Sequence, residues 1–144
     1  MKWLFERFYR KDKGFTLIEL LIVIIILAVL AGIAIPSYLS ITNRAKESGT
    51  EAEMASIAVA LEMYSTDKGG YPVATNWNTL ISGGGYMVTV PTKDKWSADY
   101  VYAPTGTAGT GTPVVYPGYT LTSTGNGTAI VFTNGQQTGM GKNP

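Results

Sequence analysis

Residues 13–21 read Lys13-Gly14-Phe15-Thr16-Leu17-Ile18-Glu19-Leu20-Leu21. They join a basic leader to an apolar run in which Thr16 and Glu19 are the only polar side chains between Phe15 and Ile35. A helix of about 21 residues rises roughly 31 Å, which matches the hydrocarbon core of a bilayer. The stretch therefore predicts a membrane-spanning helix that begins near Phe15.

The charges on either side of this run predict its orientation. The leader carries the basic residues Lys2, Arg7, Arg10, Lys11 and Lys13. On the other side only Arg44 and Lys46 lie close to the run, and glutamates surround them. By the positive-inside rule, residues 1–14 lie in the cytoplasm and the rest of the chain after the helix lies outside.

Glu19 is the most informative single residue of the apolar run. A carboxylate inside lipid is costly, so its presence indicates a function. Glu19 follows Phe15 by four residues, which places both on one face of the helix, a turn apart. A buried acid gains most from a cation in the same dry environment. The alternative is that Glu19 lies near the lipid headgroups on the leader side.

Residues 13–36 resemble the N-terminus of a prepilin, the precursor of type IV pilins and of the pseudopilins of type II secretion. The resemblance implies that a prepilin peptidase, a membrane aspartyl protease, cuts between Gly14 and Phe15, and that the new amine of Phe15 is methylated. It also implies that Glu19 neutralises this amine on a neighbouring subunit of a filament. Pro36 stands where the family has a proline, and with Gly32 it predicts a bend or a locally melted stretch.

Several chemistries are absent from the composition. The chain has no cysteine and no histidine, which excludes disulfides, thiolate nucleophiles, histidine-based catalysis and the usual zinc sites. Residues 15–144 carry six basic and eight acidic side chains, so no basic surface for nucleic acid is expected. We therefore expect neither an enzyme nor a cofactor.

A second, amphipathic part of the helix is predicted after Pro36. It should run to about Ser65, and Gly69-Gly70 should end it with residues that accept a left-handed backbone. Three- and four-residue spacing predicts one buried stripe along this part. The stripe consists of Tyr38, Ile41, Ala45, Ala52, Ala55 and Val59. The apolar segment from Met54 to Tyr64 should be covered by a sheet.

Short runs rich in β-branched and aromatic residues predict that sheet. The predicted strands are Tyr86–Val90, Tyr100–Ala103, Tyr116–Ser123 and Ala129–Thr133. Asn126-Gly127 is a hairpin signal between the last two. Residues 134–144 are polar and glycine-bearing and read as a tail without a strand. The fold class is α+β, with a long N-terminal helix and a small C-terminal antiparallel sheet.

The body also resembles the major pseudopilin of type II secretion, in which a segment reading approximately Asp-Pro-Trp-Gly lies near acids that hold calcium. Here Lys95 replaces the proline and Ser97 the glycine, whereas Asp94 and Asp99 remain. Calcium requires several oxygen ligands, and lysines flank Asp94. Asp94 and Asp99 are weak candidates for a metal site, and an ordinary surface pair or turn acids are the alternative.

Together these features predict four segments: a cleaved leader (1–14), a membrane and assembly helix (15–36), an amphipathic helix (37–68) and a loop-and-sheet head (69–144). The expected function is the structural subunit of a type IV pilus-like helical filament. Its precursor waits in the inner membrane, and assembly machinery moves it into a homo-oligomeric surface fibre. The alternatives are the major pseudopilin of type II secretion and a secreted binding module with an ordinary signal peptide.

Overall fold

The computed structural model describes residues 14–125 and 127–142. The predicted leader up to Lys13, and Asn126 of the predicted hairpin, lie outside the described residues. The chain divides into two units, residues 1–41 and residues 42–144. Helix α1 (Leu17–Lys68) contributes its first part to one unit and its second part to the other.

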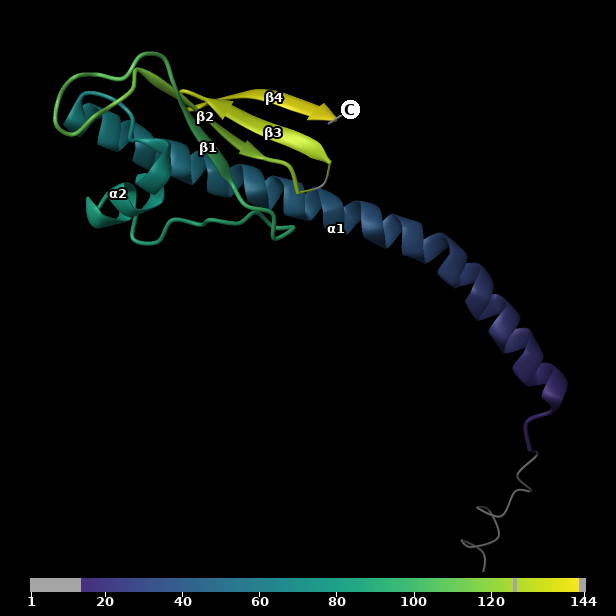
Figure 1. The fold of residues 1–144 in the computed structure, drawn as a ribbon. Coiled ribbons are helices and arrows are strands. Elements are labelled where there is room, and N and C mark those ends of the chain that lie inside the picture. The colour runs from purple at the N-terminus through teal and green to yellow at the C-terminus, as the bar shows by residue number, and fades with distance from the viewer. Residues whose placement is uncertain (1–13, 126, 143–144) are drawn as a thin grey trace, which may run out of the picture. The chain divides into compact units, whose positions relative to one another are not determined.

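Helix α1 is continuous from Leu17 to Lys68, with Pro36 inside it (Figure 1). The melted stretch that Gly32 and Pro36 predicted is not present in this structure. Ser37 donates its hydroxyl to the carbonyl of Ile33 at 3.2 Å, one turn earlier. The predicted end is confirmed, because Gly69 and Gly70 both donate their N–H to the carbonyl of Ser65 and Gly69 has a φ of 78°.

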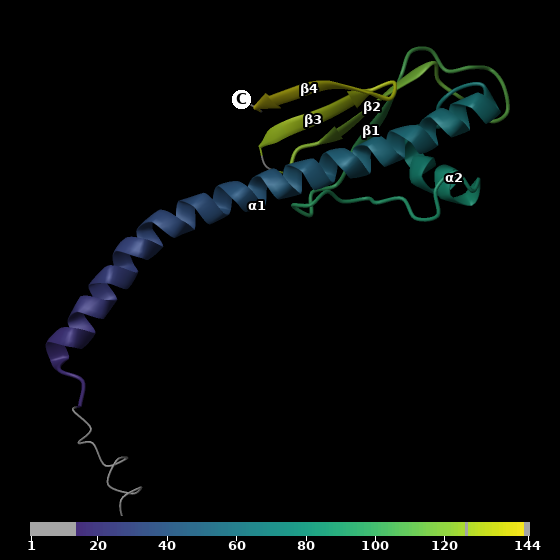
Figure 2. The same cartoon turned by 180° about the vertical axis from the view of Figure 1, so that it is seen from behind.

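The head is a four-stranded antiparallel sheet in the order β1-β2-β3-β4, lying along the second part of α1 (Figures 1 and 2). The strands are β1 (Val101–Thr105), β2 (Gly118–Ser123), β3 (Thr128–Thr133) and β4 (Gln136–Lys142). A 3-10 turn, η1 (Ala74–Asn76), and a short helix, α2 (Trp77–Gly83), connect α1 to the sheet. The predicted α+β class is confirmed.

The core lies between one face of α1 and the inner face of the sheet. The helix buries Met54, Ile57, Leu61 and Tyr64, as predicted for the segment from Met54 to Tyr64. The sheet and connections contribute Tyr71, Trp77, Tyr102, Tyr119, Leu121, Ile130 and Phe132. Rings follow one another through this core, with centroids 5.2 Å apart from Trp77 to Tyr102 and 5.7 Å from Tyr102 to Tyr119. With no disulfide available, this aromatic packing and its hydrogen bonds hold the head.

The predicted buried stripe is wrong. All six of its residues are exposed, Val59 to 60% of its surface, because the sheet covers the opposite face of the helix. The strand predicted at Tyr86–Val90 is also wrong, and these residues form an irregular connection. The predicted tail instead forms β4, which pairs with β3 after a turn at Asn134 (φ 48°) and Gly135 (φ 79°).

Candidate functional site

Thr16 and Glu19 form a reciprocal hydrogen-bonded cap at the start of α1. Glu19 Oε2 accepts hydrogen bonds from the Thr16 N–H at 2.9 Å and from the Thr16 hydroxyl at 2.7 Å. The Glu19 N–H in turn donates to Thr16 Oγ1 at 3.3 Å. This is a capping box, which satisfies two backbone donors that a helix terminus otherwise leaves free. The Thr-x-x-Glu spacing in the sequence carried this signal, and our sequence analysis missed it.

Gly14 and Phe15 precede the helix in an open, non-helical segment. Helix α1 begins only at Leu17, and the Phe15 side chain is 82% exposed. Among the described residues, apart from its chain neighbours, none lies within 4 Å of the position that a Gly14 side chain would take. The described residues therefore leave the peptide bond between Gly14 and Phe15 uncovered, as cleavage by a protease requires.

The first part of α1 presents apolar side chains all round. Every residue from Leu17 to Ile35 is exposed. Within the described residues, this is the one helix long and apolar enough to cross a membrane. A helix that is apolar on all faces needs lipid or other protein around it. Nothing described in residues 14–41 supplies that cover.

Asp94 and Asp99, the weak metal candidates, lie in one short turn but bind different partners. Asp94 is 6% exposed, and its carboxylate accepts four hydrogen bonds. The donors are the N–H groups of Trp96 (2.9 Å), Ala98 (2.9 Å) and Gly125 (3.1 Å) and the hydroxyl of Ser123 (2.6 Å). Asp99 is exposed and pairs with Lys93 at 2.8 Å. These donors use the oxygens that calcium would need, so the residues do not fit a calcium site.

Within the described residues, no cluster of three or more acidic, histidine or cysteine side chains could hold a metal ion. Asp94 instead ties the 94–98 turn to the hairpin between β2 and β3. A buried carboxylate with all its acceptors used is a structural element.

Lys95, at the position of the subfamily's proline, ties the same turn to α1. Its ammonium forms an ion pair with Glu53, and its backbone N–H donates to Thr50 Oγ1 at 3.3 Å. A proline could not make that second contact because it lacks the N–H. Tyr100 adds a hydroxyl hydrogen bond to Glu53 at 3.0 Å, and burial together with this contact raises the pKa of Tyr100. Compared with the pseudopilin pattern, Lys95 thus lacks the rigidity of a proline in the turn but makes two contacts to α1.

Two family models match the chain in consecutive segments. Residues 9–35 match the prokaryotic N-terminal methylation motif, which covers Gly14, Phe15 and Glu19. Residues 37–134 match type II secretion system protein G, from the second part of α1 to the end of β3. The chain belongs to the type II secretion system protein G family. Strand β4 lies beyond the part of the chain that the protein G model matches.

Individual relatives come from both secretion systems and pili. The type II secretion system core protein G of Pseudomonas aeruginosa is 32% identical over 117 residues, covering 69% of this chain and 79% of that protein. The core protein G of Vibrio cholerae is 32% identical over 113 residues, covering 70% and 77%. A type IV wide pilus major component of Thermus thermophilus is 44% identical over 75 residues, covering 52% and 56%. No solved structure matches this chain.

Proposed function

We propose that this member of the protein G family is the structural subunit of a type IV pilus-like helical filament. The precursor spans the inner membrane with residues 1–14 in the cytoplasm. Prepilin peptidase cleaves between Gly14 and Phe15, the amine of Phe15 is methylated, and residues 15–36 then pack with other copies as the subunit leaves the membrane. The observation that supports the proposal is an exposed apolar helix, preceded by a Gly14–Phe15 bond that no described residue covers.

Glu19 guides assembly by pairing with the ammonium group of Phe15 on an adjacent subunit. Its capping box uses Oε2 alone, and Oε1 accepts no hydrogen bond from the described residues. Oε1 is therefore oriented at the helix start and available for a second charge. The pair gains most where water is excluded, so it favours subunits brought into register inside lipid or inside a filament core.

Two kinds of filament fit the family, and different observations favour each. A pilus is favoured by the 44% identity to the Thermus thermophilus pilus component and by the departure of the Asp94 turn from the calcium-holding pattern. A secretion pseudopilin is favoured by the protein G match, which extends through the whole second part of α1 and most of the sheet. Long sheared fibres made of this subunit support the first. Their absence, together with a secretion defect on deletion, supports the second.

The proposal is tested by mass spectrometry and by substitution at Glu19. The mature chain should begin at Phe15 with one added methyl group, and a start near Gly32 or Ile35 would instead indicate a secreted module. Glu19→Val should be processed normally but lower the filament yield by about tenfold or more. The substitution leaves the Phe15 ammonium of the adjacent subunit without a counter-charge, and an unpaired charge in lipid costs roughly 2.5–3.5 kcal/mol.

Glu19→Gln is the matched control, because glutamine still accepts the Thr16 hydrogen bonds of a capping box but carries no charge. We expect it to assemble as poorly as Glu19→Val. Wild-type yield from Glu19→Gln would show that the cap, and not the charge pair, is what assembly requires.

A further inference from the structure

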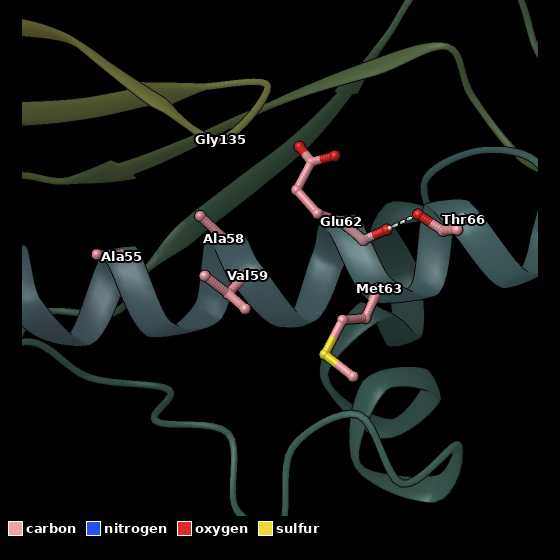
Figure 3. A pocket seen from close by; sticks show the side chains of 7 residues that line it. All are labelled: Ala55, Ala58, Val59, Glu62, Met63, Thr66 and Gly135. Atoms are coloured by element: carbon pink, nitrogen blue, oxygen red, sulfur yellow. Dashed lines mark hydrogen bonds between the residues drawn. The ribbon is translucent and has the colours of Figure 1, made fainter.

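The exposed face of the second part of α1 carries an open groove of about 360 Å³ next to the β3–β4 turn (Figure 3). Ala55, Ala58, Val59, Glu62, Met63 and Thr66 line it from the helix, and Gly135 from the turn. In Figure 3, Ala58 and Glu62 point to the side of the turn and Met63 to the opposite side. The groove therefore lies at the border between the β3–β4 turn and the helix face that the sheet leaves uncovered, with Ala58 buried and Val59 and Met63 exposed.

The surface of this groove is unusually apolar for an exposed helix face. Val59 is 60% and Met63 51% exposed, and Ala55 lies beside them. Apolar side chains at such spacing normally face a partner. Because the sheet already covers the opposite face, a partner for this one must come from outside the chain.

Glu62 gives the groove one negative charge. Its Oε1 accepts the hydroxyl hydrogen bond of Tyr71 at 2.7 Å, and Oε2 accepts none from the described residues. The Gly135 backbone comes so close that an added side chain would meet Glu62 at 3.0 Å. The carboxylate is thus held at the groove wall with one oxygen open, which favours a partner that brings a cation beside an apolar or small surface.

Arg44 is such a cation, and it lies on the same helix. Arg44 is exposed and forms no ion pair with any described residue. It precedes Glu62 by about five helical turns of 3.6 residues, so both project from the same side of the rod, roughly 27 Å apart. Ala45 and Ser48, which follow Arg44, are small and exposed. A parallel copy that is displaced by that distance, and rotated about the helix axis so that this side faces the groove, places residues 44–48 against it.

We propose that the groove at residues 55–66 receives residues 44–48 of α1 from a second copy, with the Arg44 guanidinium against the Glu62 carboxylate. This inference rests on the proposed filament, and it extends the contact between subunits beyond the apolar segment to the head. Residues 15–36 can pack against other copies at many axial displacements, because nearly all of their side chains are apolar. The Arg44–Glu62 pair favours one displacement between neighbours, because this guanidinium and this carboxylate meet at a single offset.

Cysteine crosslinking in assembled filaments tests the offset directly, since the chain has no native cysteine. Ser48 and Thr66 are exposed and have the same separation as Arg44 and Glu62. Within one chain they are roughly 27 Å apart, far beyond the ~7 Å limit of a disulfide, so Ser48→Cys with Thr66→Cys can link only two copies. We expect a ladder of disulfide-linked oligomers. The control pair, Ser48→Cys with Thr79→Cys on α2, should give none.

Charge exchange tests the pair. Arg44→Glu and Glu62→Lys should each lower the filament yield by about tenfold, and the double variant should restore most of it, in line with measured couplings of close charge pairs. Glu62→Gln keeps an acceptor for Tyr71 and should also lower the yield. Equal thermal unfolding of Glu62→Gln and wild type would show that its head remains folded.

The outcomes separate this inference from the proposed function. Normal filaments of the Ser48→Cys, Thr66→Cys variant without a crosslink, or an Arg44→Glu variant that assembles normally, would overturn the groove contact and leave the filament intact. A crosslink from the groove to a different protein would overturn it as well. Absence of wild-type filaments would instead contradict the proposed function itself.

Discussion

Helix α1 is one continuous helix with two different surfaces. From Leu17 to Ile35 every residue is exposed and almost every side chain is apolar. From Thr42 to Lys68 the helix has one face buried under the sheet, with Met54, Ile57 and Leu61 fully covered, and one face exposed. The backbone geometry is the same in both parts, so the difference lies only in what the side chains have to contact.

This difference separates two sources of stability. The second part of α1 gains its stability within the chain, from a core that a single molecule completes. The first part has no such partner among the described residues, and its apolar surface is stabilised only by lipid or by other copies. In the proposed filament, a subunit built this way folds its head before assembly and keeps its apolar helix in the membrane until then.

The largest expected effect comes from the same substitution placed in the two parts. Leu61→Ala should lower the free energy of unfolding of the head by about 2–5 kcal/mol, because it opens a cavity in a fully buried site. Leu27→Ala, on the exposed part, should change it by less than about 0.5 kcal/mol. Urea unfolding of the full chain in detergent, followed by near-ultraviolet circular dichroism, measures both. A comparable loss in Leu27→Ala would mean that the two parts do not have separate stabilities.

Within the head, the two aspartates of the 94–99 turn should differ next. Asp94→Ala removes the acceptor of four hydrogen bonds at a buried position, and we expect a loss of about 3 kcal/mol. Asp99→Ala breaks one exposed ion pair with Lys93 and should cost less than about 1 kcal/mol. Thermal unfolding of each variant checks the ranking, and equal losses would contradict it.

Thermal unfolding also tests whether the head has a calcium site. A ligand that binds only the folded state raises Tm, so a calcium site in the head would show as a higher Tm in calcium than in a chelator. Because Asp94 is saturated by internal donors, we expect the two curves to coincide. A calcium-dependent increase in Tm that Asp94→Ala abolishes would show that the turn rearranges to bind the ion.

The sequence predicted the features that depend on local pattern. A helix long and apolar enough to cross a membrane follows from the apolar run that begins at Phe15, and its end from Gly69-Gly70. The capping box was equally local, since Thr16 and Glu19 have the required spacing, but the resemblance to a prepilin directed attention to the charge of Glu19 rather than to its hydrogen bonds.

The features that the sequence analysis missed depend on contacts between distant segments. The spacing of Ala45, Ala52 and Val59 is that of a buried stripe, yet the sheet packs on the other side, where Thr50 and Gly49 accommodate the turn that carries Lys95. Strand β4 is rich in glycine, threonine and glutamine and has no alternating pattern, so only its pairing with β3 defines it. The hydrogen bonds from Ser123 and Gly125 to Asp94 could not be predicted either, because these residues lie far from Asp94 in the sequence.

Alkaline pH should destabilise the head of the protein and leave the first part of α1 unchanged. Burial, with the hydrogen bond and charge of Glu62, raises the pKa of Tyr71 to about 12, and burial also raises the pKa values of Tyr102 and Tyr119. A raised pKa means that the folded head holds the phenol protons more tightly than the unfolded chain, whose tyrosines titrate near 10. The stability that these tyrosines contribute should therefore be fully present below pH 10 and be lost as the pH rises above it, for Tyr71 between pH 10 and about 12.

Tyr71→Phe is the control for this pH dependence. It should cost about 1 kcal/mol at pH 8, where it removes the hydrogen bond to Glu62. The cost should shrink above pH 10, because the phenol of unfolded wild-type Tyr71 ionises there while the folded head still holds its proton. The helix from Leu17 to Ile35 contains no tyrosine or lysine, so its helical signal in detergent should not change over this range. A constant difference between Tyr71→Phe and wild type at every pH would contradict the assignment.

The smallest expected effect concerns Ser97, at the turn that joins the head to α1. Ser97 has a φ of 69°, a left-handed conformation that costs a non-glycine residue energy, and its position is that of a glycine in the pseudopilin pattern. Ser97→Gly should raise the stability of the head by about 0.5 kcal/mol, whereas Ser97→Ala, which keeps the strained backbone, should leave it unchanged. Urea unfolding resolves such a difference when the two curves have equal slopes. If Ser97→Gly instead destabilised the head, the entropy that glycine adds to the unfolded chain would outweigh the relief of strain, and the turn would owe its conformation to its hydrogen bonds with Asp94 rather than to the residue at its apex.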